Sequence, residues 1–304
     1  VSFAFILIAF MSPMLSGIAD YSGKRLVFLR FFTILGSVSC MALFFFKSAD
    51  GALFGSIAFI LGTIGFGAGI VFYNAYLPEI TSEENYDKVS AKGYAYGYVG
   101  SVILLIMILG MIQFSDQLGL SADNMAIRIG FVLVGLWWLG FAQITFKRLP
   151  KDVKEPFQSS FIAKGFKEVK QVFQETIKDA NITKFLASYF FFIAGVNVVI
   201  YLASIFAQEE LGFGRSELII VILLLQLVAM IGAYFFAFIS KFIGNKKALL
   251  IQISIWIGVC VAAYFTADKM MFYIICAFVG LVLGGIQSLS RSSYSKMIDE
   301  NEGV

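Results

Sequence analysis

The chain has 304 residues, of which 59% are hydrophobic and only 14% are charged, against about a quarter charged in typical soluble domains. This composition excludes a soluble globular protein and indicates an integral membrane protein. The net charge of +3 does not indicate a nucleic-acid partner, because the basic residues gather in alternate loops, as cytoplasmic loops of membrane proteins require.

Nine apolar segments follow one another along the chain, each nearly free of charge and long enough to cross a hydrocarbon core about 30 Å thick. Strands of a membrane barrel would be about half as long and would alternate in polarity. We therefore predict an all-α integral membrane bundle. The spans are predicted at residues 1–19, 26–46, 52–73, 94–112, 129–146, 185–207, 218–239, 248–267 and 270–290.

The basic residues set the predicted orientation. Most of the 23 Lys and Arg residues fall on one side of the spans, which the positive-inside rule assigns to the cytoplasm. The basic residues on the other side are Lys47, Arg128, Arg215 and Lys269. This puts Val1 outside and Val304 inside. A chain that begins outside without a signal peptide needs an earlier span, so we expect a fragment of a longer protein.

The first turn, G-I-A-D-Y-S-G-K-R, holds an acid, two glycines and two cations between two apolar spans. Gly17 would let neighbouring helices approach closely, Asp20 would lie at the end of the first helix, and Gly23 would allow a positive φ in the reversal. Lys24 and Arg25 would anchor the loop on the cytoplasmic side. Such a turn is typical of a membrane protein that changes conformation.

The next cytoplasmic loop lies between residues 74 and 98. Asn74 and Glu79 stand where one span ends, and Ser90 is predicted to cap the following helix. Four acids share this loop with two lysines. We interpret it as a loop that contacts a partner rather than as a catalytic one.

The longest hydrophilic stretch, residues 147–184, separates five predicted spans from four. Its second part has apolar residues at helical spacing with lysines between them, which predicts an amphipathic helix on the cytoplasmic leaflet; a solvated linker helix is the alternative. The apolar positions are Phe161 or Ile162, Phe166, Val169, Phe173 and Ile177. We predict an N-terminal half at 1–146, this linker, and a C-terminal half at 185–304.

The two predicted halves resemble divergent copies. Gly23 and Arg25 align with Gly244 and Lys246, which pairs one cytoplasmic loop with another, as a parallel repeat requires. Lys241 stands where the first copy has Asp20. The second loop is therefore a degenerate copy of the first.

Uncharged polar residues in the spans are the candidates for solute binding, because transport needs polar groups at membrane depth. We predict substrate contacts at Asn197, Gln226 and Gln287, and at Asn74 at a span end. Hydrogen bonding between helices is the alternative for each.

The sequence offers little for catalysis or for a cofactor. Histidine is absent, and the three cysteines all lie inside predicted spans without ligand-like spacing, so we expect no metal and no other cofactor. There is no phosphate-binding loop, and no acid pair or Ser/His arrangement at membrane depth. We therefore expect no enzyme activity.

Several motifs carry a family resemblance. The turn at 17–25 resembles the signature loop between helices two and three of the major facilitator superfamily. F-Y-N-A-Y-L-P-E-I at 72–80, the run at 89–100, and G-G-I-Q-S-L-S-R-S at 284–292 are similar to its vacuole effluxer-like branch, which includes autophagy-related amino-acid effluxers. The resemblance covers nearly the whole chain.

This resemblance implies a twelve-helix secondary transporter with two six-helix halves and alternating access, in which the nine spans are helices two to ten. It implies that the gating loop consists of Gly17, Asp20, Gly23, Lys24 and Arg25. We add Glu79 and Arg291, which lie in two of the motifs, as candidates for a cytoplasmic latch.

The expected partners are a small polar solute, such as an amino acid or related metabolite, the lipid bilayer, and a coupling ion, either H⁺ or Na⁺. The competing interpretation is a non-transporting membrane receptor or assembly scaffold that keeps the fold. We expect a multi-pass protein of a bacterial inner membrane, with a vacuolar membrane as the alternative.

Overall fold

A computed structural model of the chain describes residues 2–152 and 160–302. These residues form helices joined by short turns, and no strand occurs among them. The helices are α1 (Ser2–Ser22), α2 (Arg25–Ala42), η1 (Leu43–Phe45), η2 (Ala49–Gly51), α3 (Ala52–Asn74), α4 (Leu77–Ile80), η3 (Glu83–Asn85), α5 (Tyr86–Gln113), η4 (Ala122–Asn124), α6 (Met125–Arg148), α7 (Ser160–Lys178), α8 (Ala180–Glu209), α9 (Arg215–Ile243), α10 (Asn245–Tyr264) and α11 (Lys269–Glu302).

Within the described residues, nine helices are long and apolar enough to cross a membrane. Each predicted span overlaps one of them, so the all-α fold class and the nine spans are confirmed. The helices that meet these criteria are α1, α2, α3, α5, α6, α8, α9, α10 and α11.

One predicted helix boundary is wrong. Ser90 was expected to cap a helix, but α5 already begins at Tyr86, so Ser90 lies in its second turn. The helix runs into polar sequence because the side chains of its first turns are buried against other helices, Asp87 and Ser90 among them.

Contacts divide the chain into two compact units. Unit 1 contains residues 1–80 and 114–179, and unit 2 contains residues 81–113 and 180–304. Helix α5 therefore packs with helices that follow the linker, although it precedes the linker in the sequence. The division into an N-terminal half and a C-terminal half stays a prediction.

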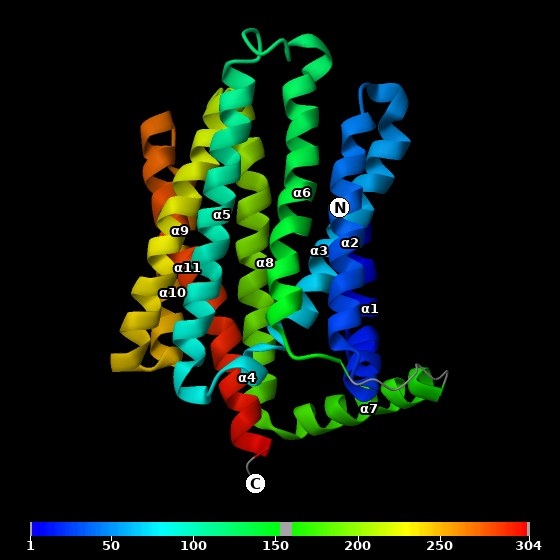
Figure 1. The fold of residues 1–304 in the computed structure, drawn as a ribbon. Coiled ribbons are helices and arrows are strands. Elements are labelled where there is room, and N and C mark those ends of the chain that lie inside the picture. Colours follow the sequence, from blue (N-terminus) through cyan, green and yellow to red (C-terminus); the bar gives the residue numbers. More distant parts are fainter. Residues whose placement is uncertain (1, 153–159, 303–304) are drawn as a thin grey trace. The chain divides into compact units, whose positions relative to one another are not determined.

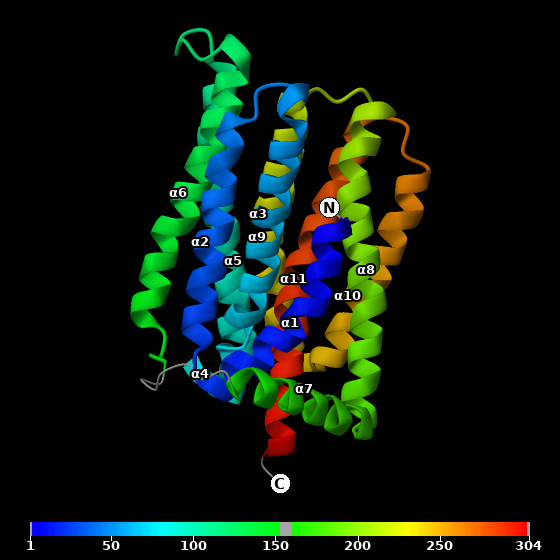
Figure 2. The same cartoon turned by 90° about the vertical axis from the view of Figure 1, so that its right-hand side faces the viewer.

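The core of unit 1 is built on aromatic rings between α2 and α3, which lie side by side in Figures 1 and 2. The ring of Phe72 stacks on those of Phe28 and Phe32, with centroid distances of 5.5 and 5.9 Å. Phe32 and Phe72 are almost completely buried. This contact fixes α3, and with it the position of α4 at its end.

The core of unit 2 is built from α9 and α11, with α5 packed against α9 (Figure 1). Small buried residues line the α5–α9 contact, namely Ala91 on one helix and Ala233 and Ala237 on the other. Small side chains allow helix backbones to approach closely, which is how membrane helices gain packing energy. The contact brings the polar start of α5 against the ends of its neighbours.

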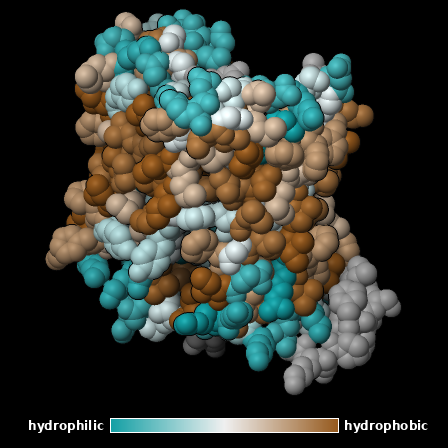
Figure 3. Space-filling model, turned by 45° about the horizontal axis from the view of Figure 1, so that its top comes forward, coloured by the Kyte–Doolittle hydropathy of each residue, from teal (hydrophilic) through white to brown (hydrophobic). Residues whose placement is uncertain are grey.

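The outer surfaces of the helices are apolar. Phe31, Phe190 and Ile257 are each more than half exposed, and hydrophobic residues cover much of the central part of the face drawn in Figure 3. Continuous apolar surface of this kind is unfavourable in water. It fits helices that face lipid.

Candidate functional site

The predicted gating loop forms a tight turn between α1 and α2. Gly23 has a φ of 61°, in the left-handed region that glycine tolerates best. Its N–H donates to the Asp20 carbonyl at 3.2 Å, and the N–H of Lys24 donates to the Ala19 carbonyl at 3.0 Å. Helix α2 then begins at Arg25. The predicted reversal at Gly23 is confirmed, whereas the gating role stays a prediction.

Arg25 joins this turn to α4. Its Nε donates to Asp20 Oδ1 at 2.8 Å, and its Nη1 pairs with the carboxylate of Glu79. The Asp20 and Glu79 side chains are 34% and 38% exposed. Because water screens such pairs, each contributes about 1 kcal/mol or less. Arg25 therefore fixes the geometry of the turn more than it stabilises the fold.

Asp152 completes this end of unit 1. Its two carboxylate oxygens accept hydrogen bonds from the N–H groups of Leu26 and Val27, each at 2.8 Å. Those N–H groups lie in the first turn of α2, where the helix itself supplies no acceptor, and a carboxylate there also interacts favourably with the helix dipole. The carboxylate thus ties the start of the linker to the predicted gating loop.

The side chains of Asp20, Arg25, Glu79 and Asp152 line a cavity of about 240 Å³ in unit 1. Burial, and then the nearby carboxylates of Asp152 and Glu79, raise the pKa of Tyr76 to about 12. The cavity is lined by Ala19, Asp20, Gly23, Arg25, Tyr76, Glu79, Pro150, Lys151 and Asp152.

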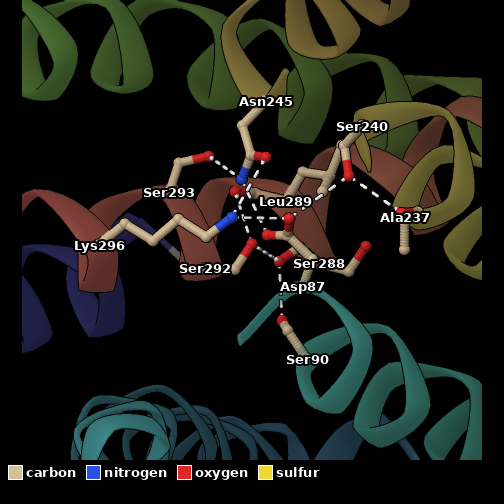
Figure 4. Close-up of polar contacts among 10 residues, drawn as sticks. All are labelled: Asp87, Ser90, Ala237, Ser240, Asn245, Ser288, Leu289, Ser292, Ser293 and Lys296. Carbon is tan, nitrogen blue, oxygen red and sulfur yellow. Dashed lines mark hydrogen bonds and ion pairs between the residues drawn. The ribbon is translucent and has the colours of Figure 1, made fainter. Parts of the chain in front are cut away.

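A second polar group lies in unit 2, where the start of α5 meets α9, α10 and α11 (Figure 4). At its centre is Asp87, which is 8% exposed. Asp87 Oδ2 accepts from Lys296 Nζ at 2.7 Å and from Ser240 Oγ at 3.4 Å, and Oδ1 accepts from Asn245 Nδ2 at 2.8 Å. Asn245 Nδ2 also donates to Ser293 Oγ at 3.1 Å. We call these five residues the Asp87 cluster.

The Asp87 cluster meets the cost of burying a carboxylate. An ionised group removed from water needs both a counter-charge and hydrogen bonds. Lys296 supplies the charge, and Asn245 and Ser240 supply further donors. Three helices thus converge on one side chain of α5.

The contact between α5 and α11 continues along both helices. Ser90 Oγ donates to the Ser288 carbonyl at 2.7 Å and accepts from Arg291 Nε at 2.9 Å. One turn further on, the Arg291 guanidinium lies 5.0 Å from the ring centroid of Tyr94. Another turn on, the Tyr98 hydroxyl donates to Gln287 Oε1 at 2.7 Å. Two of the motifs that carry the family resemblance therefore bind each other.

The two candidate latch residues belong to different units. Glu79 pairs with Arg25 in unit 1, whereas Arg291 binds Ser90 in unit 2. Each therefore has its partner within its own unit. A latch that includes both residues stays a prediction.

The candidate substrate residues lie in different surroundings. Asn74 is the last residue of α3, and Asn197 is exposed on α8. Gln226 on α9 has a buried Oε1 without a hydrogen-bond partner within the described residues, whereas Gln287 already accepts from Tyr98. Their role in solute binding stays a prediction.

The Asp87 cluster and the contacts of Asp152 were not predicted from the sequence. A signal for the first was available, because Asp87, Ser90, Tyr94 and Tyr98 follow at spacings of three and four residues, which places them on one helix face. For Asp152 no local pattern exists, because its partners precede it by more than a hundred residues. Among the described residues, no group of acids and cysteines is arranged to hold a metal ion.

Comparison with known proteins identifies the family. A family model described as vacuole effluxer Atg22 like matches residues 1–302. The chain belongs to this family. The predicted resemblance to the vacuole effluxer-like branch is therefore confirmed.

Three relatives illustrate the range of similarity. The uncharacterized MFS-type transporter YxiO of Bacillus subtilis is 30% identical, over 96% of this chain and 68% of its own length. Autophagy-related protein 22-1 of Aspergillus niger and autophagy-related protein 22 of Yarrowia lipolytica are each 23% identical over 93% of the chain. The chain spans 60% and 62% of these two fungal proteins. No solved structure matches the chain.

Proposed function

We propose that the protein is a secondary transporter that moves a small polar solute across a membrane by alternating access, and that the Asp87 cluster latches its cytoplasmic side. One observation carries the proposal. Asp87 stands on α5, in the predicted N-terminal half, yet its hydrogen-bond partners among the described residues stand on helices of the predicted C-terminal half.

Alternating access explains why this contact is ionic. If the two predicted halves rock against each other, α5 must separate from α10 and α11 whenever the cytoplasmic side opens. An apolar contact would expose hydrophobic surface to water at that moment. Asp87 and Lys296 can instead be hydrated after they separate, so their pair holds the closed state without preventing the open one.

The Ser90–Arg291 contact belongs to the same latch, since it also joins α5 to α11. The predicted gating loop is not part of this latch. Arg25 connects the ends of α1, α2 and α4, which all belong to the predicted N-terminal half. The loop would therefore move as one piece.

For the solute we propose an amino acid or a related metabolite, as the motif resemblance to amino-acid effluxers implies. The family description, vacuole effluxer Atg22 like, supports efflux. Gln226 is the favoured contact among the candidates, because its buried Oε1 has no hydrogen-bond partner in the described part of the chain and buried polar atoms usually have one. The coupling ion would be H⁺ or Na⁺. A bacterial inner membrane is the proposed location, and a vacuolar membrane is the alternative.

The test is solute flux through the full-length protein in liposomes, with an amino-acid panel. Asp87→Asn should change the flux several-fold, because the cytoplasmic side no longer closes normally. Glu217→Gln is the matched control, since the Glu217–Lys269 pair joins α9 to α11 within one predicted half. Normal flux in Asp87→Asn would remove the latch from the account.

A receptor or scaffold is the second candidate. It is favoured by Gln287, a candidate solute contact that is already occupied by Tyr98. Thermal unfolding separates the two functions, because a transported solute stabilises the folded protein by mass action. A scaffold would show the same unfolding temperature with every member of the panel.

A further inference from the structure

Helix α7 presents an apolar edge that unit 1 leaves uncovered. Phe166, Phe173 and Ile177 are 43%, 63% and 55% exposed. Their spacings of seven and four residues place them on one side of the helix. Phe161 and Ile162, which the sequence pattern also included, have side chains outside the described part.

One flank of this apolar edge is fixed to α1. A methyl group on Gly17 would lie 2.7 Å from the Gly165 carbonyl oxygen and 2.3 Å from the Val169 side chain, so the two helices touch at their backbones. The Lys164 Nζ lies 5.3 Å from the ring centroid of Tyr21, which adds a second contact. Helix α7 is therefore held against α1 and crosses its end (Figure 2).

The contact with α1 sets the depth of α7. Gly17 lies five residues before the end of α1 at Ser22, which corresponds to about 7 Å along a helix axis. Amphipathic helices at a membrane surface lie with their apolar face about 5–10 Å into the boundary between headgroups and acyl chains. If the end of α1 marks the cytoplasmic boundary of its span, the apolar edge of α7 lies at the depth where lipid covers it.

The other flank of the edge is basic. Lys167, Lys170 and Lys178 are all exposed, and helical geometry places them beyond the apolar edge, on the side away from Gly165 and Val169. Lys170 lies one turn from Phe166. Lysines beside an apolar edge keep their methylene groups on the apolar surface and their charges among the headgroups. Their charge matches an anionic surface.

We propose that α7 binds the anionic headgroups of the cytoplasmic leaflet through Lys167, Lys170 and Lys178, with Phe166, Phe173 and Ile177 inserted among the acyl chains. Because Gly17 packs on Gly165, this binding also holds the end of α1 that carries Asp20. The proposal does not depend on the transport function.

The test is hydrogen exchange of the α7 amides in the full-length protein, in nanodiscs of phosphatidylcholine alone or mixed with phosphatidylglycerol. Three lysines near an anionic surface should slow exchange at least about tenfold in the mixed nanodiscs. In the triple variant K167Q/K170Q/K178Q, the difference between the lipids should fall to about twofold or less.

Two further variants make the result specific. K88Q/K92Q removes two exposed lysines from α5 and should leave the lipid effect on α7 intact. Phe173→Gln should speed α7 exchange in both lipids, because it removes apolar insertion and not charge. Equal α7 exchange of the unmodified protein in the two lipids, or loss of the effect in K88Q/K92Q, would overturn the proposal.

Discussion

The turn between α1 and α2 and the turn between α9 and α10 each contain a glycine at positive φ: Gly23 at 61° and Gly244 at 81°. At the first turn, Arg25 binds carboxylates that are about a third exposed. At the second, Asn245 binds Asp87, whose side chain is only 11% exposed. The polar contacts at the first turn, in unit 1, are therefore open to water, whereas those at the second turn, in unit 2, are buried.

The difference lies in the origin of the carboxylate. Asp20 and Glu79 come from α1 and α4, which belong to the same predicted half as Arg25. Asp87 comes from α5 and crosses from one predicted half to the other. In the proposed alternating-access cycle, a contact within one half can persist, whereas a contact between the halves has to form and break. Because water screens a buried ion pair less, we expect the contact of Asp87 with Lys296 to be stronger than that of Arg25 with Asp20.

The largest effect is expected for Asp87→Ala. It leaves Lys296 and Asn245 without their shared acceptor, and removal of one member of a buried pair should lower the free energy of unfolding by about 2–4 kcal/mol. Thermal or denaturant unfolding in detergent measures this. Adding Lys296→Met should recover part of the loss, because the uncompensated charge is then gone; a fully additive double variant would argue against a coupled pair.

Ser90→Ala should have the next largest effect, about 1–2 kcal/mol, because one hydroxyl both donates to Ser288 and accepts from Arg291. Ser254→Ala is the control, since that exposed serine only donates to the carbonyl one turn earlier. The same unfolding experiment should show almost no change for the control. If both variants lost the same free energy of unfolding, the α5–α11 contact at Ser90 would add nothing to stability.

Asp152→Ala should cost about 1 kcal/mol, the usual effect of removing a helix cap. Asp152→Asn should cost less, since its amide oxygen can still accept one of the two N–H groups. The loss should appear as faster hydrogen exchange of Leu26 and Val27. Unchanged exchange at these two amides would show that the linker does not hold the start of α2.

Asp20→Asn should have the smallest effect on stability, about 0.5 kcal/mol or less, because the pair with Arg25 is exposed and screened. The change should shrink further in high salt. A loss as large as that of Asp87→Ala would contradict the contrast between the open and the buried cluster.

Hydropathy and charge predicted the helices well, and Gly23 marked its turn, because span length and φ are local properties. The spacing from Asp87 to Tyr98 indicated a shared helix face, but the partners of Asp87 on other helices could not be derived in the same way. Apolar patterning locates a span but does not say which helix ends converge, and the acids at 79–87 have the composition of a solvated loop. Only the packing of α5 against α9 and α11 makes Asp87 differ from Glu83 and Glu84. Asp152 was missed for the same reason, since its partners lie on α2.

The latch is tested most directly by the distance between α5 and α10 in the full-length protein. Spin labels are placed at Lys92 and Lys247, which are both exposed, after Cys40, Cys260 and Cys276 have been replaced. Double electron–electron resonance then measures the distance between the two labels. If Asp87→Asn destabilises the closed state relative to the open state by about 2 kcal/mol, the ratio of open to closed molecules should rise about thirtyfold. Glu217→Gln should leave this ratio unchanged. An unchanged distance distribution in Asp87→Asn would contradict the account.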